Sequence, residues 1–101
     1  MIELNSKQRA GLRSLAMTMS PIFQIGKGGI SEEMTRQIDN ALEARELIKI
    51  HVLDNCDYDA RSAAQELSEA TDAVVVQVVG SKITLFRPSE KKPKIDWKHL
   101  G

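Results

Sequence analysis

The sequence predicts a single α/β domain of the two-layer α+β kind, in which helices pack on a four-stranded mixed sheet. A chain of 101 residues, 42% of them apolar, is long enough to bury one hydrophobic core. Segments with helical spacing of apolar residues alternate with short strand-like runs, in the order α-β-α-β-α-β-β. A strand, a helix and a strand in succession predict a parallel pair, whereas the last two strands form a hairpin and must be antiparallel.

The first helix is expected to be capped by Asn5 or Ser6, since both side chains accept hydrogen bonds from the N–H groups of a first helical turn. Its apolar residues recur at i, i+3, i+4 and i+7, and they are Leu12, Leu15, Ala16 and Met19. Pro21 ends this segment, and residues 22–25 predict a short strand.

The remaining elements have caps and turns of their own. Ser31 is expected to cap a second helix, and Asp57 or Asp59 a third. Three further strand-like runs are residues 47–53, 73–79 and 82–87. The last two runs are joined by Gly80-Ser81, a two-residue hairpin signal.

The chain is expected to divide at Pro88 into a domain, residues 1–88, and a basic C-terminal tail, residues 89–101. The tail is polar and rich in lysine and contains Pro93, a composition typical of segments that cannot bury a core. We expect it to be loose, unless Trp97 packs back on the domain.

The neutral net charge conceals an uneven distribution along the chain. Residues 1–30 carry four lysines and arginines against one acidic residue, and residues 87–101 carry five against two. Residues 31–86 carry five against eleven aspartates and glutamates. If the two basic ends meet in space, they form a positive surface that favours a polyanionic partner. Otherwise they are ordinary solvated charges.

A lysine lies among three glycines in the stretch QIGKGGIS, residues 24–31. Gly26 to Gly29 form G-x-x-G, the loop with which KH-type domains clamp a nucleic-acid backbone. Glycines leave peptide N–H groups accessible to a phosphate, and the following helix adds the positive end of its dipole. Because the motif is short, a strand-to-helix turn that needs glycine for its dihedral angles is the alternative explanation.

No cluster of residues predicts catalysis or a metal site. Cys56 and His51 could pair as nucleophile and base, but an ordinary strand position explains His51 better. Asp57 and Asp59 are better explained as helix caps than as an acid–base pair. One cysteine and two histidines lack the spacing of metal ligands. We therefore expect no enzymatic activity, no cofactor, no metal and no small-molecule substrate.

The compartment follows from three features. One cysteine cannot form an internal disulfide, the N-terminal segment is charged, and the apolar runs are too short to span a membrane. We expect a cytoplasmic protein that does not bind membranes. The four aromatic residues include two in strand-like runs, so base stacking is not expected to dominate binding.

Four stretches of the sequence together resemble one known family. They are LNSKQR (residues 4–9), PIFQIGKGG (21–29), ALEARELIK (41–49) and VGSKITLFRP (79–88). In this order they resemble the CRM domain family, named for chloroplast RNA splicing and ribosome maturation, and in particular its bacterial single-domain YhbY-type members. The resemblance implies a fold similar to the C-terminal domain of translation initiation factor three. It also implies binding to RNA, with ribosomal RNA or a pre-50S particle as the partner and ribosome assembly as the process.

The resemblance places RNA contacts on the first helix and the glycine stretch, and Arg87 is added because of its charge. The expected RNA-binding residues are Lys7, Arg9, Arg13, Gly26, Lys27, Gly28, Gly29 and Arg87. We expect the first helix and the glycines to form one basic face of a monomer, with the acidic helices turned away. The alternative is a protein-interaction module whose acidic helices bind a ribosomal or assembly protein.

Overall fold

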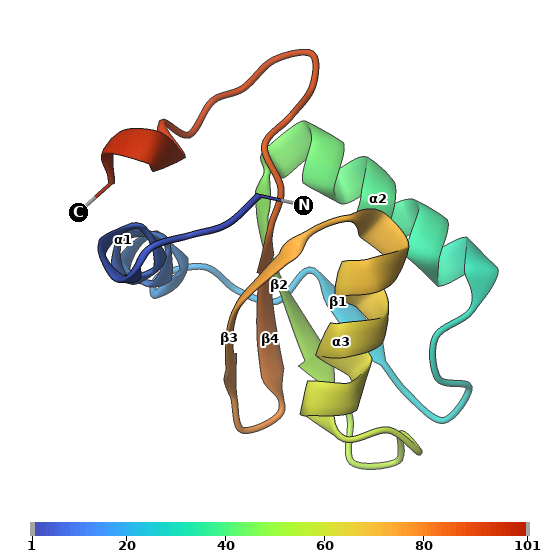
Figure 1. Ribbon diagram of the computed structural model, residues 1–101. Helices are drawn as coiled ribbons and strands as arrows, with labels where there is room; N and C mark the ends of the chain where they lie inside the picture. The colour runs from blue at the N-terminus through green and yellow to red at the C-terminus, as the bar shows by residue number, and fades with distance from the viewer. Residues whose placement is uncertain (1, 101) are drawn as a thin grey trace.

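The computed structural model describes residues 2–100 and confirms the predicted fold class (Figure 1). The elements are α1 (Ser6–Ala16), β1 (Phe23–Ile25), α2 (Glu32–Arg45), β2 (Leu47–Val52), α3 (Ala60–Thr71), β3 (Val74–Val79), β4 (Lys82–Phe86) and a short 3₁₀ helix, η1 (Trp97–His99). The strands lie in the order β1-β2-β4-β3. As expected, β1 and β2 are parallel, while β4 runs antiparallel to both of its neighbours.

The helices begin at capping side chains that the sequence predicts. Asn5 accepts the N–H of Gln8 at 2.8 Å, and the side chain of Gln8 accepts the N–H of Asn5 in return, which forms a capping box. Ser31 and Asp59 each accept an N–H from the first turn of the helix that follows, at 3.0 and 2.7 Å. Of the two candidates for the third helix, the cap is therefore Asp59 and not Asp57.

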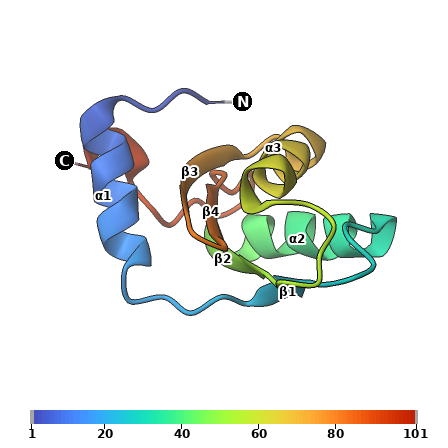
Figure 2. The same ribbon diagram turned by 90° about the horizontal axis from the view of Figure 1, so that it is seen from below.

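One face of the sheet packs against α2 and α3, which lie side by side on it (Figures 1 and 2). Because side chains alternate along a strand, Ile48, Ile50 and Val52 of β2 all point into this core. The buried residues that meet them include Ile38, Leu42, Ala63, Ala64, Leu67, Ile83 and Leu85. This is the main hydrophobic core, and it fixes the register of the sheet.

Helix α1 and the C-terminal tail cover part of the opposite face. Leu12 and Ala16 of α1 are fully buried in a second cluster with three residues of the sheet, Leu47, Val76 and Phe86. Leu15, expected on the same stripe, is 45% exposed. The buried stripe of α1 is therefore narrower than the sequence predicts, because the helix packs on the sheet along one i, i+4 row.

The tail is fastened to the domain through the carboxylate of Glu46, a fully buried residue at the end of α2. This carboxylate accepts three backbone N–H groups, from Ser89 at 2.8 Å, Lys94 at 2.6 Å and Ile95 at 2.8 Å. Glu46 has a φ of 68°, in the left-handed region that favours glycine. A glutamate here accepts some backbone strain, and its carboxylate satisfies backbone donors that would otherwise be buried without partners.

Glu43, one turn earlier on α2, holds the same segment from outside. Its carboxylate accepts the hydroxyl of Ser89 and the N–H groups of Glu90 and Lys91. Further along, the ring of Trp97 packs edge to face on Phe86, with centroids 6.4 Å apart. Up to residue 100 the tail is therefore not loose. Of the two possibilities that the sequence left open, the structure shows the one in which Trp97 packs back on the domain.

Replacing Glu46 tests the first of these attachments. The Glu46→Ala variant keeps the backbone strain but leaves one buried and two part-buried N–H groups without their acceptor, so the free energy of unfolding should fall by about 2–4 kcal/mol. Denaturant unfolding monitored by circular dichroism would measure it. As the control, alanine at the exposed Glu66 of α3 should change stability by less than about 0.5 kcal/mol. Equal stability of the two variants would contradict a structural role for Glu46.

Acid should weaken the attachment of the tail at Glu43. The hydrogen bond from the Ser89 hydroxyl, followed by that from the Glu90 N–H, lowers the pKa of Glu43 below its ordinary value of 4.5. A lowered pKa in the folded state means that this contribution to stability is present above pH 4.5 and is lost as the pH falls below it. Emission from Trp97, the single tryptophan, should shift to the red over that range. In the Glu43→Gln variant the red shift should be smaller, and an unchanged transition would argue against this contact.

Candidate nucleic-acid interface

The glycine loop, Gly26 to Gly29, is a tight turn between β1 and α2. The N–H of Gly29 donates to the carbonyl of Gly26 at 2.9 Å, and Gly29 has a φ of 68°. A Cβ on Gly29 would lie 3.1 Å from the ring of Tyr58. The turn itself therefore requires glycine at position 29, for its dihedral angle and for the space beside Tyr58.

Gly28 has a different role, because the turn does not need it. Its φ is not positive, and a Cβ added there would meet no atom within 4 Å. Lys27 beside it is exposed and has no hydrogen-bond or ion-pair partner among residues 2–100. Lys27 and Gly28 thus form an exposed tip, where a bare backbone and a free ammonium group are available to a phosphate.

Acidic residues surround this tip and limit its positive charge. Glu32 and Glu33 occupy the first turn of α2. Arg36 bonds Glu33, and this bond, together with a weaker one from Gln37, lowers the pKa of Glu33. Glu33 therefore stays ionised, and its charge is partly balanced by Arg36.

The segment after β2 adds two more acidic residues near the loop. It lies against the glycines, since the Oδ1 of Asn55 is 3.6 Å from the position of a Cβ on Gly26. Asp54 and Asp57 flank this contact and are exposed. The loop has the geometry of an anion site but supplies only one cation of its own.

Two of the three cations expected on α1 are available. Lys7 and Arg13 are exposed and make no hydrogen bond or ion pair with any described residue. Arg9 is partly buried, and its Nη1 donates to the carbonyls of Val75 at 2.5 Å and Val76 at 3.0 Å. The pairing of β3 with β4 is irregular at this point, so these carbonyls need donors from outside the ladder. Arg9 supplies them and attaches α1 to the sheet.

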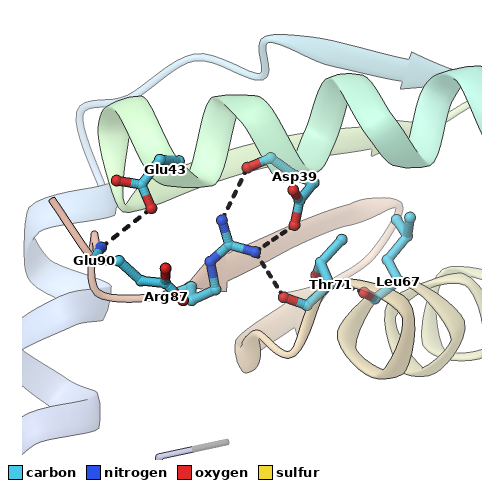
Figure 3. Close-up of polar contacts among 6 residues, drawn as sticks. All are labelled: Asp39, Glu43, Leu67, Thr71, Arg87 and Glu90. Carbon is cyan, nitrogen blue, oxygen red and sulfur yellow. Dashed lines mark hydrogen bonds and ion pairs between the residues drawn. The ribbon is translucent and has the colours of Figure 1, made fainter.

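Arg87 is also committed within the protein, as Figure 3 shows. Its Nη1 contacts the carboxylate of Asp39 at 2.5 Å and the carbonyl of Thr71 at 2.8 Å, and its Nη2 donates to the carbonyl of Asp39 at 3.0 Å. Only 17% of the side chain is exposed. Arg87 joins α2 to the end of α3, and little of its guanidinium remains for another partner.

The glycine loop and α1 do not form one basic face by themselves. In both views α1 lies at one margin of the molecule and the loop between β1 and α2 at the other, with the sheet between them (Figures 1 and 2). The molecule extends 39 Å along its longest axis. The charge pattern identified these two basic elements, but it carried no information about their separation.

Sequence reasoning missed three basic side chains on the sheet. Lys49 and His51 of β2 lie on the face opposite to Ile48 and Ile50, and His51 pairs with Lys82 of β4. For β2 the signal was present in the alternation of residues 48–52, where Lys49 and His51 separate three apolar residues.

The other chemistry considered for the sequence finds little support among the described residues. Within residues 2–100 no group of three or more His, Cys, Asp or Glu side chains is placed to hold a metal ion. Cys56 is a free thiol whose Sγ accepts the N–H of Tyr58 at 3.4 Å. Over the same part of the chain, no helix has the length and apolar character needed to cross a membrane.

Comparison with known proteins points in one direction. The CRS1/YhbY (CRM) domain model matches residues 4–87. The chain is 44% identical over 93 residues to "Probable RNA-binding protein YqeI" of Bacillus subtilis, covering 92% of this chain and 97% of that protein. It is 33% identical over 91 residues to a Haemophilus influenzae protein named "RNA-binding protein", covering 90% and 92%. The solution structure of SAV1595 from Staphylococcus aureus matches with a TM-score of 0.78 and 52% identity, covering 98% and 100%.

Two glycine substitutions should show that the turn needs glycine at position 29 and not at position 28. Gly29→Ala forces a side chain into the left-handed region and against Tyr58, so we expect a loss of about 1–2 kcal/mol in the free energy of unfolding. Gly28→Ala enters open space and should leave stability within about 0.5 kcal/mol of the parent. Thermal melts of both variants would measure the difference. If Gly28→Ala were the more destabilising, the described loop geometry would be incorrect.

Proposed function

Because the chain belongs to the CRS1/YhbY (CRM) domain family, we propose that it binds RNA and that Lys27 and Gly28 contact the phosphate backbone. The observation that carries this proposal is the open backbone at Gly28, which the turn does not require, next to an exposed lysine without a partner in the described chain. Names given to relatives support RNA as the class of ligand. The work of the loop is binding, since phosphate contacts need donors and charge but no catalytic group.

We assign the expected RNA-binding residues to two roles. Gly26, Lys27, Gly28 and Gly29 form the loop contact, and Lys7 and Arg13 of α1 make phosphate contacts at the other end of the molecule. Arg9 and Arg87 have the second role, which is to hold the helices in position and not to contact the RNA. Their guanidinium groups are held by backbone carbonyls and, for Arg87, by Asp39.

The biological ligand we propose is ribosomal RNA within a pre-50S particle, bound by one copy of the protein as an assembly factor. Contacts to phosphate and to RNA shape fit this ligand, because folded ribosomal RNA presents closely spaced phosphates. Helices α2 and α3 pack on the face of the sheet opposite to α1, so their exposed acidic residues beyond the first turn of α2 would face away from the RNA, whereas Glu32 and Glu33 lie beside the loop.

A salt titration of a labelled ribosomal RNA fragment tests the loop. The Lys27→Asp/Gly28→Asp variant removes one phosphate contact and adds two anions at the tip, so affinity should fall by at least tenfold while the fold is retained. Wild-type affinity should decrease steeply as salt increases. Fluorescence anisotropy measures both effects, and circular dichroism confirms folding.

The matched control carries the same change in net charge in the second half of α2, whose last residue lies about 20 Å along the helix from the loop. Asn40→Asp/Arg45→Asp alters two exposed residues and should leave RNA affinity within about twofold. If both variants bound like the wild type, the RNA site would lie elsewhere. If no variant and no wild type bound RNA, the acidic helices would become the candidate interface, with a ribosomal or assembly protein as partner.

A further inference from the structure

The lower part of one sheet face, towards the β3–β4 turn, is not covered by a helix. Helix α1, the chain that follows it and the tail cover this face only around Leu47, Val76 and Phe86. Below them the strand pairing aligns two rows across the sheet. One row joins Gln24, His51, Lys82 and Val79, and the other joins Lys49, Thr84 and Gln77, in which Thr84 is buried. This open sheet face is polar and basic, with Val79 as its exposed apolar residue at the edge.

The charges on the open sheet face all have the same sign. Lys82 is exposed and Lys49 is half-buried, and neither makes a hydrogen bond or ion pair with any described residue. His51 lies between them, two residues from Lys49 and directly opposite Lys82. The strand residues that point to this face include no aspartate or glutamate. Unpaired cations spaced along adjacent strands are complementary to a chain of phosphates.

The open sheet face also lies between the glycine loop and α1, the two basic elements that do not form one continuous face by themselves. Gln24 begins one row and is followed, after Ile25, by the glycine loop. From there the row crosses β2 and β4 to β3, on the same face of the sheet on which α1 packs against Leu47, Val76 and Phe86. Three strand spacings of about 4.8 Å give a path of about 14 Å across the sheet.

We propose that a single RNA strand held at the glycine loop continues across the open sheet face, with its phosphates contacting Lys49 and Lys82 and its polar groups contacting His51. This inference rests on the proposed function, and it adds the path and the length of the bound strand. The glycine loop has one cation among four nearby acidic residues, so the sheet provides most of the positive charge on this side of the molecule. A strand fits better than a double helix, because the face has no protruding element to enter a groove.

Binding of short and long RNA distinguishes the loop from the sheet. One probe is a uridine tetranucleotide, the length that a KH-type loop clamps, and the other is an oligouridine three times as long. The Lys49→Gln/Lys82→Gln variant should bind the tetranucleotide like the wild type but bind the long probe at least fivefold more weakly. Its salt slope on the long probe should fall by about 1.4, which corresponds to two phosphate contacts of a single strand.

Two further variants provide the controls. Lys91→Gln/Lys92→Gln removes the same charge from the exposed tail and should change neither affinity by more than about twofold. Lys49→Arg/Lys82→Arg keeps the charge on the sheet and should restore binding of the long probe, which separates lost phosphate contacts from a disturbed strand. Thermal melts identify any variant that does not fold.

The outcomes separate this inference from the function on which it rests. Loss of the length advantage in the glutamine variant, with rescue by arginine, would support the path across the sheet. Equal binding of the long probe by the wild type and the glutamine variant would overturn the path and leave the glycine loop intact, and the open sheet face would then be a candidate surface for a protein. Failure of the wild type to bind either probe or the ribosomal fragment would overturn the proposed function itself.

Discussion

The buried carboxylate of Glu46 is the interaction on which the arrangement of the charged surfaces depends. It holds the backbone at Ser89, Lys94 and Ile95, and this brings the side chain of Ile95 and that of Trp97 into the cluster beneath α1. The side chain of Gln8 on α1 also donates to the carbonyl of Lys98 in the tail. Helix α1 is thus held between sheet and tail, and the direction in which its free cations point follows from an acidic residue at the end of α2.

The arginines show that a charged residue in the sequence can either be exposed to solvent or be held by groups within the protein, and the sequence alone does not distinguish the two cases. Arg9 and Arg87 looked equivalent to Arg13, yet their guanidinium groups contact carbonyls 66 and 16 residues away in the chain, respectively. A planar group with five donors suits this task, since it can serve several carbonyl and carboxylate oxygens at once. Of these three arginines, Arg13 therefore remains available to a polyanion, while Arg9 and Arg87 keep the helices in place.

Local signals predicted most of the fold, and long-range contacts account for what they missed. Asn5, Ser31 and Asp59 mark helix starts because capping involves residues three positions apart. The docking of the tail depends on carboxylates more than forty residues earlier in the chain, and no local pattern reports it. For the same reason the glycine stretch could be recognised from the sequence, whereas its distance from α1 depends on the strand order β1-β2-β4-β3.

The two faces of the sheet differ in character, since one is apolar and forms the core and the other carries basic side chains. Along β2 the even-numbered residues Ile48 and Ile50 form the core, and the odd-numbered residues Lys49 and His51 face the open side. A shift of one residue in the pairing with β4 would exchange the two sets, placing charges in the core and isoleucines in water. The same hydrophobic burial that fixes the register therefore fixes which cations are presented. A protein with no net charge can in this way present a positive face on one side of its sheet and pack its acidic helices on the other.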